Sequence, residues 1–441
     1  MRSARLRSVL APLVLILLSF LSVLVHVPGN TALSPIDEFV YVDYLEKVPT
    51  EFVVTQGEPT GDYARGEWLC KGVRLVQDPR PAECAAFTAA AEPTVDWPFA
   101  GKTSADIYTP LYFAVTWVLA QPFRLLGVSD LADAGSYAGA IWLSAGMLFL
   151  FAALRRIGVG RVLAVSLGAV LIATPAVFWS STYVSTDAPS LAVGAALLWL
   201  AVRIMQGRSG RIALLAVSFL GVLLKVQNIL AVALVGLALI GHALSSAWRR
   251  RRDETGGGWF WRTLATRDVI TAVLAVILSA AGQVVWLAVR AAVSSGPSPD
   301  QGVGAPLTVA AIVREALKFL PAAATDPTGG ANSIALVIAG TIVSWISIMG
   351  VLWLTVAGRE GTPEVWIARS ALVVSVIGGP LLVASTVLVS GYYFQLPVRY
   401  GIALIPAFLL AASVVLKDRR GVVRSFAAIS GLVYLAALAG T

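Results

Sequence analysis

Two adjacent acids, Asp37 and Glu38, follow the first long apolar run of this 441-residue chain. A helix beginning near Glu38 would extend the acidic band through Asp43 and interleave it with Tyr41 and Tyr44. In such a pair one carboxylate can accept a proton while the other positions or buffers it, which suits a general base at a membrane surface. The other interpretation is an ordinary helix start, where acids cap free amide groups.

Two later segments place polar side chains beside apolar runs. Asp187 begins a run directly after Ser185 and Thr186, as a second acid of a site or as a helix cap. Lys225 and Gln227 lie in a turn between two runs. A lysine at this turn suits an anionic partner, and extension of its side chain to the membrane interface is the other interpretation.

Residues 391–400 join two further apolar runs and combine an arginine with aromatic residues and a glutamine. The planar fork of an arginine is well suited to a phosphate group. The aromatic rings could stack on a sugar or anchor the chain at the membrane interface. The candidate residues in this segment are Tyr393, Gln395, Arg399 and Tyr400.

The composition is that of a membrane protein. Charged residues make up 13% of the chain, against roughly 25% in soluble proteins, while apolar residues make up 57% and the mean hydropathy is +0.79. These values exclude a soluble enzyme, a disordered chain and a nucleic-acid-binding domain whose net charge of +8 would cover its surface. We therefore predict an all-α protein with many membrane spans.

Apolar runs of about 20 residues predict about eleven transmembrane helices. A further stretch, 108–127, is interrupted by two prolines, a glutamine and an arginine, and we expect it to lie at the membrane surface or to re-enter the bilayer. The eleven predicted spans are 8–27, 136–154, 162–180, 187–206, 212–226, 228–247, 268–290, 333–357, 370–390, 399–416 and 423–440.

The basic residues predict the orientation of these spans. Most of them lie in six short segments that fall on one side of the membrane only if 108–127 does not span it. Because lysine and arginine stay preferentially on the cytoplasmic side, we expect a plasma-membrane protein with a cytoplasmic N-terminus and an extracytoplasmic C-terminus. The first span, within residues 1–27, is expected to be an uncleaved anchor.

Residues 28–133 form the predicted first extracytoplasmic loop, which carries juxtamembrane helices ahead of a polytopic domain at 134–441. The loop holds 15 acidic and seven basic residues, together with the two cysteines of the chain, Cys70 and Cys84. In an oxidising compartment these cysteines are expected to pair as a disulfide, with free thiols as the alternative. A second outer loop, 291–332, contains an amphipathic stretch at 307–320.

The order of these motifs resembles that of the GT-C glycosyltransferases, a superfamily that includes protein O-mannosyltransferases, aminoarabinose transferases and arabinosyltransferases. The acidic pair after the first span resembles the family's Asp-Glu signature, and Tyr108-Thr109-Pro110-Leu111-Tyr112-Phe113 resembles its juxtamembrane Pro-Pro-Leu-Tyr-Tyr segment. The remaining matches are Ser185-Thr186-Asp187-Ala188, Leu224-Lys225-Val226-Gln227 and Pro397-Val398-Arg399-Tyr400.

The resemblance implies a GT-C-like fold and transfer of a sugar from a polyprenyl-phosphate donor. The acceptor would be an envelope glycan, lipid or protein on the extracytoplasmic face, and membrane lipid would surround the protein. Asp37 would be the general base of an inverting reaction, with Glu38 assisting. The resemblance leaves a divalent cation open. The implied substrate-binding residues are Tyr108, Asp187, Lys225, Gln227, Tyr393, Gln395, Arg399 and Tyr400.

Two other functions are compatible with the sequence. A transporter or flippase for a lipid-linked saccharide would also need polar groups beside membrane spans, although such proteins tend to carry ionisable residues near mid-membrane and to show internal repeats. A non-catalytic envelope assembly protein would use the acidic loop to bind a partner.

Overall fold

The computed structural model describes residues 2–74, 98–250, 263–299, 301–320 and 333–440. Within these ranges the regular secondary structure is helical, apart from three isolated β-bridges. The all-helical membrane fold expected from the composition is therefore confirmed. The predicted disulfide partner Cys84 lies outside the described residues, so the Cys70–Cys84 pairing stays a prediction.

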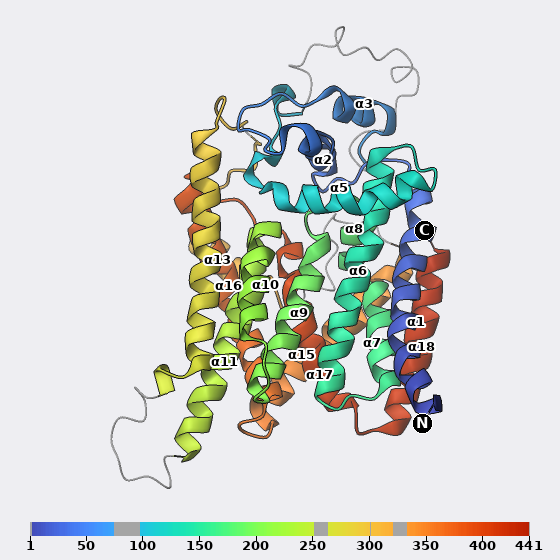
Figure 1. Ribbon diagram of the computed structural model, residues 1–441, viewed down its shortest axis with the longest axis vertical. Coiled ribbons are helices and arrows are strands. Elements are labelled where there is room, and N and C mark those ends of the chain that lie inside the picture. The colour runs from blue at the N-terminus through green and yellow to red at the C-terminus, as the bar shows by residue number, and fades with distance from the viewer. Residues whose placement is uncertain (1, 75–97, 251–262, 300, 321–332, 441) are drawn as a thin grey trace.

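Nine helical segments in the described part of the chain are long and apolar enough to cross a membrane. Each matches a predicted span, and together they form an upright bundle (Figure 1). The helices are α1 (Arg2–His26), α6 (Leu131–Arg156), α9 (Ala188–Met205), α11 (Ile229–Arg250), α13 (Arg267–Ala292), α15 (Ile334–Ala357), α16 (Pro363–Ser390), α17 (Ile405–Leu416, extended by a 3-10 turn at Val398–Leu404) and α18 (Arg420–Ala439).

The other two predicted spans are helical but shorter or bent. Residues 162–180 form α7 (Arg161–Ile172) and α8 (Pro175–Ser181), which meet at an angle of 69°. The break occurs because Thr174 caps α8 through its side chain and Pro175 starts it, so the α7 hydrogen-bond ladder cannot continue. Residues 212–226 form the 14-residue α10 (Arg211–Leu224). The count of eleven spans thus stays a prediction.

Helices α2 (Glu38–Glu51), α3 (Asp62–Lys71) and α5 (Pro110–Leu125) cover one end of the bundle (Figure 1). Helix α5 runs across this end rather than along the bundle, as expected for the stretch 108–127. Its start is fixed by Pro110 and by Thr109, whose hydroxyl accepts the Leu111 N–H. We call this layer the cap.

Basic residues gather at the end of the bundle opposite the cap. Helix α6 runs from the cap to Arg156, whose guanidinium donates to Gln206 Oε1 over 3.1 Å just beyond α9. Lys417, at the end of α17, donates to the Ile157 carbonyl over 3.3 Å. Two of the predicted basic segments thus lie close together at this end, and its cytoplasmic assignment remains a prediction.

Helix α9 is the most buried of the candidate spans and contacts α6, α10, α11 and the turn before α17. Gly194 permits its closest approach, since a Cβ there would overlap the carbonyl of Ala403. Asp187 precedes α9 and Arg399 lies in that neighbouring turn. The packing of α9 therefore brings two distant site candidates together.

Candidate active site

Four charged side chains form a continuous chain beneath the cap. Arg399 Nη2 lies 3.2 Å from Asp37 Oδ2, and its Nε lies 3.2 Å from Asp187 Oδ2. The other oxygen of Asp187 pairs with the Lys225 ammonium. The four side chains thus alternate between negative and positive charge, although Asp37 and Arg399 are more than 360 positions apart in sequence.

The chain of charges runs from partly exposed to fully buried. The Asp37 side chain is 46% exposed and Arg399 13%, while Asp187 and Lys225 are only 2% and 1% exposed. Lys225 also donates to the Thr186 hydroxyl over 3.3 Å. Buried charges are tolerable when they are paired and hydrogen-bonded, and Asp187 supplies that pairing for both cations.

Neither acid acts as a helix cap through its side chain, although each precedes a helix. Asp37 lies before α2 with φ of 55° and Asp187 before α9, and neither carboxylate accepts a capping hydrogen bond. The left-handed backbone at Asp37 is unusual for a residue other than glycine, although aspartate and asparagine tolerate it best. The capping interpretation therefore does not hold for either side chain, and their roles in a site stay predictions.

Tyrosines surround the charges. The ring of Tyr400 lies 5.3 Å from Lys225 Nζ and 5.7 Å from Arg399 Cζ, within the range of cation–π contact. The hydroxyls of Tyr41 and Tyr108 are hydrogen-bonded at 3.0 Å. Tyr41, on α2, is fully buried and ties the start of α2 to the segment before α5.

Glu38 is placed differently from Asp37 and does not join the chain of charges. Its carboxylate is buried and accepts the N–H groups of Ser34 over 2.6 Å and Val184 over 2.7 Å. Burial raises the pKa of the Glu38 carboxyl to about 7, although these two hydrogen bonds favour its charged form. Glu38 thus joins the turn that carries Asp37 to the loop that carries Asp187.

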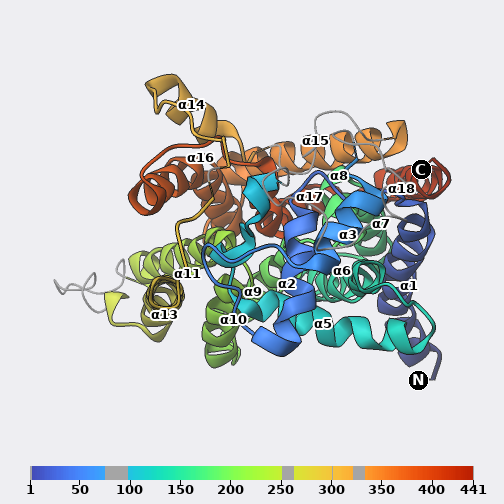
Figure 2. The same cartoon turned by 90° about the horizontal axis from the view of Figure 1, so that it is seen from above.

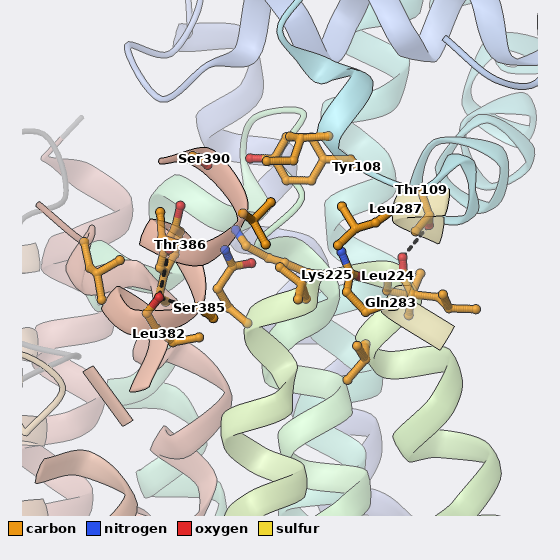
Figure 3. A pocket seen from close by; sticks show the side chains of 18 of the residues that line it. Tyr108, Thr109, Leu224, Lys225, Gln283, Leu287, Leu382, Ser385, Thr386 and Ser390 are labelled. Carbon is orange, nitrogen blue, oxygen red and sulfur yellow. Dashed lines mark hydrogen bonds between the residues drawn. The ribbon is translucent and has the colours of Figure 1, made fainter. Parts of the chain in front are cut away.

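A pocket with an empty volume of about 960 Å³ opens beside Lys225. Figure 3 shows Tyr108 above Lys225, with Ser385, Thr386 and Ser390 of α16 on one side and Gln283 and Leu287 of α13 on the other. Gln227 and Tyr400 also line the pocket. Tyr108, Lys225, Gln227 and Tyr400, all singled out in the sequence, therefore line the same pocket.

The pocket continues into an apolar groove between membrane-spanning helices. The groove has an empty volume of about 1170 Å³ and shares Leu382 and Ser385 with the pocket. Its other walls are aliphatic side chains and glycines of α11, α13 and α16, and α11 lies between the other two helices when viewed from above (Figure 2). A pocket lined by Lys225 thus adjoins an apolar groove between candidate membrane spans.

Tyr393 and Gln395 lie apart from this site. The Tyr393 hydroxyl donates to the buried Glu315 over 2.8 Å and accepts from Arg314 over 3.1 Å. Both partners lie on α14 (Val309–Leu317). Gln395 is exposed and does not line the pocket. The helix α14 falls inside the predicted amphipathic stretch 307–320, and Lys318 just after it pairs with Glu315 at 2.9 Å.

Several residues of the site were not among the candidate catalytic or binding residues taken from the sequence. Thr186 contacts Lys225, Tyr41 contacts Tyr108, and Gln283 lines the pocket from within an otherwise apolar helix. A polar amide inside a membrane span is a signal that could have identified Gln283. In the described ranges, no group of three or more histidine, cysteine or acidic side chains could hold a metal ion.

Comparisons with known proteins give structural matches only. No protein-family model matches the chain, and no curated protein sequence does. The crystal structure of ArnT from Cupriavidus metallidurans bound to undecaprenyl phosphate is similar, with 18% identity and a TM-score of 0.49 over 98% of this chain. The apo structure of the same ArnT gives 17% identity and a TM-score of 0.49 over 97%. The chain spans 63% and 62% of the length of these two ArnT chains.

Proposed function

We propose that this protein is a membrane glycosyltransferase of the GT-C type that moves a sugar from a polyprenyl-phosphate donor to a hydroxyl acceptor at the cap end of the bundle. The observation that carries the proposal is the union of a paired-charge site with an apolar groove. A polyprenyl-phosphate sugar has matching parts: an anionic phosphate, a polar sugar and a long hydrocarbon chain.

Lys225 and Arg399 are proposed to bind the donor phosphate. Lys225 lines the pocket, and Asp187 holds it close to Arg399. As the bond from the anomeric carbon to the phosphate oxygen breaks, negative charge grows on that phosphate. Cations held in place before the reaction stabilise this charge without reorganisation of solvent.

Asp37 is proposed as the general base. It is the most exposed acid of the chain of charges, so an acceptor can reach it, and its carboxylate makes no capping hydrogen bond. The acceptor hydroxyl gives its proton to Asp37, its oxygen attacks the anomeric carbon, and polyprenyl phosphate leaves with the electron pair of the broken bond. Attack opposite the leaving group inverts the anomeric configuration.

The prenyl chain is proposed to occupy the groove between α11, α13 and α16. Residues lining it include Leu230, Val276 and Leu381, and the groove meets the pocket at Leu382. Because lipid tails are as apolar as the groove, a prenyl chain there would be held by van der Waals packing against these side chains. The donor could enter from the bilayer without passing through water.

The test is transfer by purified protein in lipid vesicles, with a radiolabelled polyprenyl-phosphate hexose as donor and a cell-envelope fraction as acceptor. The variant Asp37→Asn keeps a residue that tolerates the left-handed backbone but removes the base. We expect it to lose about 100-fold to 10,000-fold in rate while donor binding is retained. Lys225→Met should instead weaken donor binding.

Three outcomes separate the alternatives. Undiminished transfer by Asp37→Asn would reject the base assignment. Donor binding by the wild type without transfer to any envelope fraction, together with movement of the donor between leaflets, would favour a flippase. Absence of donor binding would favour a non-catalytic assembly role.

A further inference from the structure

We propose that the sugar carried by the donor is uncharged, a neutral pentose or hexose. The inference rests on the proposed function, because it concerns what occupies the pocket beside Lys225. It follows from the chemical character of the pocket wall, which combines one cation with amides and hydroxyls.

The charges of the wall allow one charged group of the ligand and no more. Among the described residues that line the pocket, Lys225 is the single charged side chain, and none is a carboxylate. The donor phosphate takes Lys225 together with Arg399, which lies behind Asp187 and does not line the pocket. An ammonium on the sugar would then need a carboxylate, and a sugar carboxylate would need a third cation. Burying either group without a counter-ion is strongly unfavourable.

The nearby acids are already committed. Both oxygens of Asp187 are paired, with Lys225 and with Arg399, and its side chain is buried behind Lys225. Asp37 pairs with Arg399 and is the proposed base for the acceptor. An ammonium that paired with Asp37 would compete with the acceptor hydroxyl for this carboxylate.

The uncharged polar groups of the wall match sugar hydroxyls. Ser385 and Thr386 each donate to the Leu382 carbonyl over 2.8 Å, which leaves their oxygen lone pairs free to accept. The Oε1 atom of Gln227 is buried and has no hydrogen-bond partner. A buried carbonyl oxygen gains from a donor, and a hydroxyl can donate to Gln227 while it accepts elsewhere.

The experiment compares donors that share one polyprenyl phosphate and differ only in the sugar. The neutral sugars are mannose, glucose and arabinofuranose, and the charged ones are 4-amino-4-deoxyarabinose and galacturonic acid. Purified wild-type protein in vesicles is assayed for donor affinity, by competition with labelled donor, and for transfer to an envelope fraction. We expect the best neutral donor to exceed both charged donors at least about tenfold in kcat/KM, which corresponds to about 1.4 kcal/mol.

Equal or faster transfer from a charged donor would overturn the inference and leave the proposed function intact. Failure of sugar-free polyprenyl phosphate to compete would instead overturn the proposed function, and the inference with it. These two failures are therefore distinguishable in the same set of assays.

A variant is expected to offset this preference. Gln283→Glu adds a carboxylate to the wall from α13, and should improve the amino-sugar donor relative to the neutral one by about tenfold. Thr341→Val, on an exposed face of α15, is the control and should leave the preference unchanged. If Gln283→Glu does not fold, the wild-type comparison of donors still decides the question. An unchanged preference in a folded Gln283→Glu protein would count against the pocket as the sugar site.

Discussion

At the scale of single residues, Asp187 does most to define the site, because it is the shared counter-ion of two cations. Lys225 and Arg399 would repel each other if Asp187 did not pair with both. A phosphate that enters beside Lys225 brings a second negative charge to the same cations. We infer that Asp187 keeps the phosphate site assembled before the donor arrives.

Asp187→Asn should therefore destabilise the fold by about 3–5 kcal/mol, because it leaves the buried Lys225 without its counter-ion. The double variant Asp187→Asn with Lys225→Met removes both buried charges and should recover much of this stability, while transfer stays absent. Thermal unfolding in detergent measures the first effect and the vesicle assay the second. Equal stability of the two variants would show that the pair is not energetically coupled.

Glu38 gives the protein a specific dependence on pH. Its pKa in the folded protein, about 7, lies above the ordinary value of 4.5, so between these values the folded form holds a proton that the unfolded chain has lost. This contribution to stability is complete below pH 4.5 and is lost as the pH rises through 7. Two and a half pKa units correspond to about 3 kcal/mol.

The matched variant Glu38→Gln cannot titrate. The stability of the wild type relative to Glu38→Gln should fall between pH 5 and pH 8, as measured by thermal unfolding of both proteins in the same detergent. A difference that does not change with pH would mean that Glu38 keeps an ordinary pKa. Because Glu38 connects the Asp37 turn to the Val184 segment, the variant should also slow transfer without abolishing it.

At the scale of elements, the groove depends on small residues of α11. Gly236 lines the groove, and a Cβ there would make only ordinary contact with Ala272. Gly236→Leu should therefore be tolerated by the fold and fill part of the groove. We expect an increase of about tenfold in KM for donors with long prenyl chains and little change for donors with two isoprene units.

Gly431→Leu is the control for this experiment, because the position lies on α18 with open space around it. Its kinetics should match the wild type for donors of either length. If Gly236→Leu impairs short and long donors alike, the prenyl chain does not occupy this groove.

The sequence predicted which residues belong to the site better than it predicted where their side chains point. Asp187, Lys225 and Arg399 could be identified because each is a charged residue beside an apolar run. Charged residues are rare in such places, so a cation buried there is expected to pair with an acid. The direction of Glu38 was not predictable, because it depends on the left-handed backbone of Asp37. The location of Tyr393 depends on α14 packing against Gly379, a contact between distant segments that no local pattern records.

At the scale of the whole molecule, charge segregation predicts how the protein lies in the membrane. Residues near Arg156 and Lys417 mark one end of the bundle and the cap marks the other. If the basic end is cytoplasmic, Ser298→Cys at the cap end should react with a membrane-impermeant maleimide in intact cells. Ser209→Cys, between α9 and α10, should react only after permeabilisation. The reverse pattern would invert the proposed orientation.

The junction of the pocket and the groove at Leu382 and Ser385 has a kinetic consequence. A donor that arrives through this junction travels within a two-dimensional solvent, so the concentration that the protein experiences is the mole fraction of donor among the lipids. Adding inert phospholipid at constant bulk donor would then slow the reaction by surface dilution, and spent polyprenyl phosphate would inhibit according to its share of the bilayer.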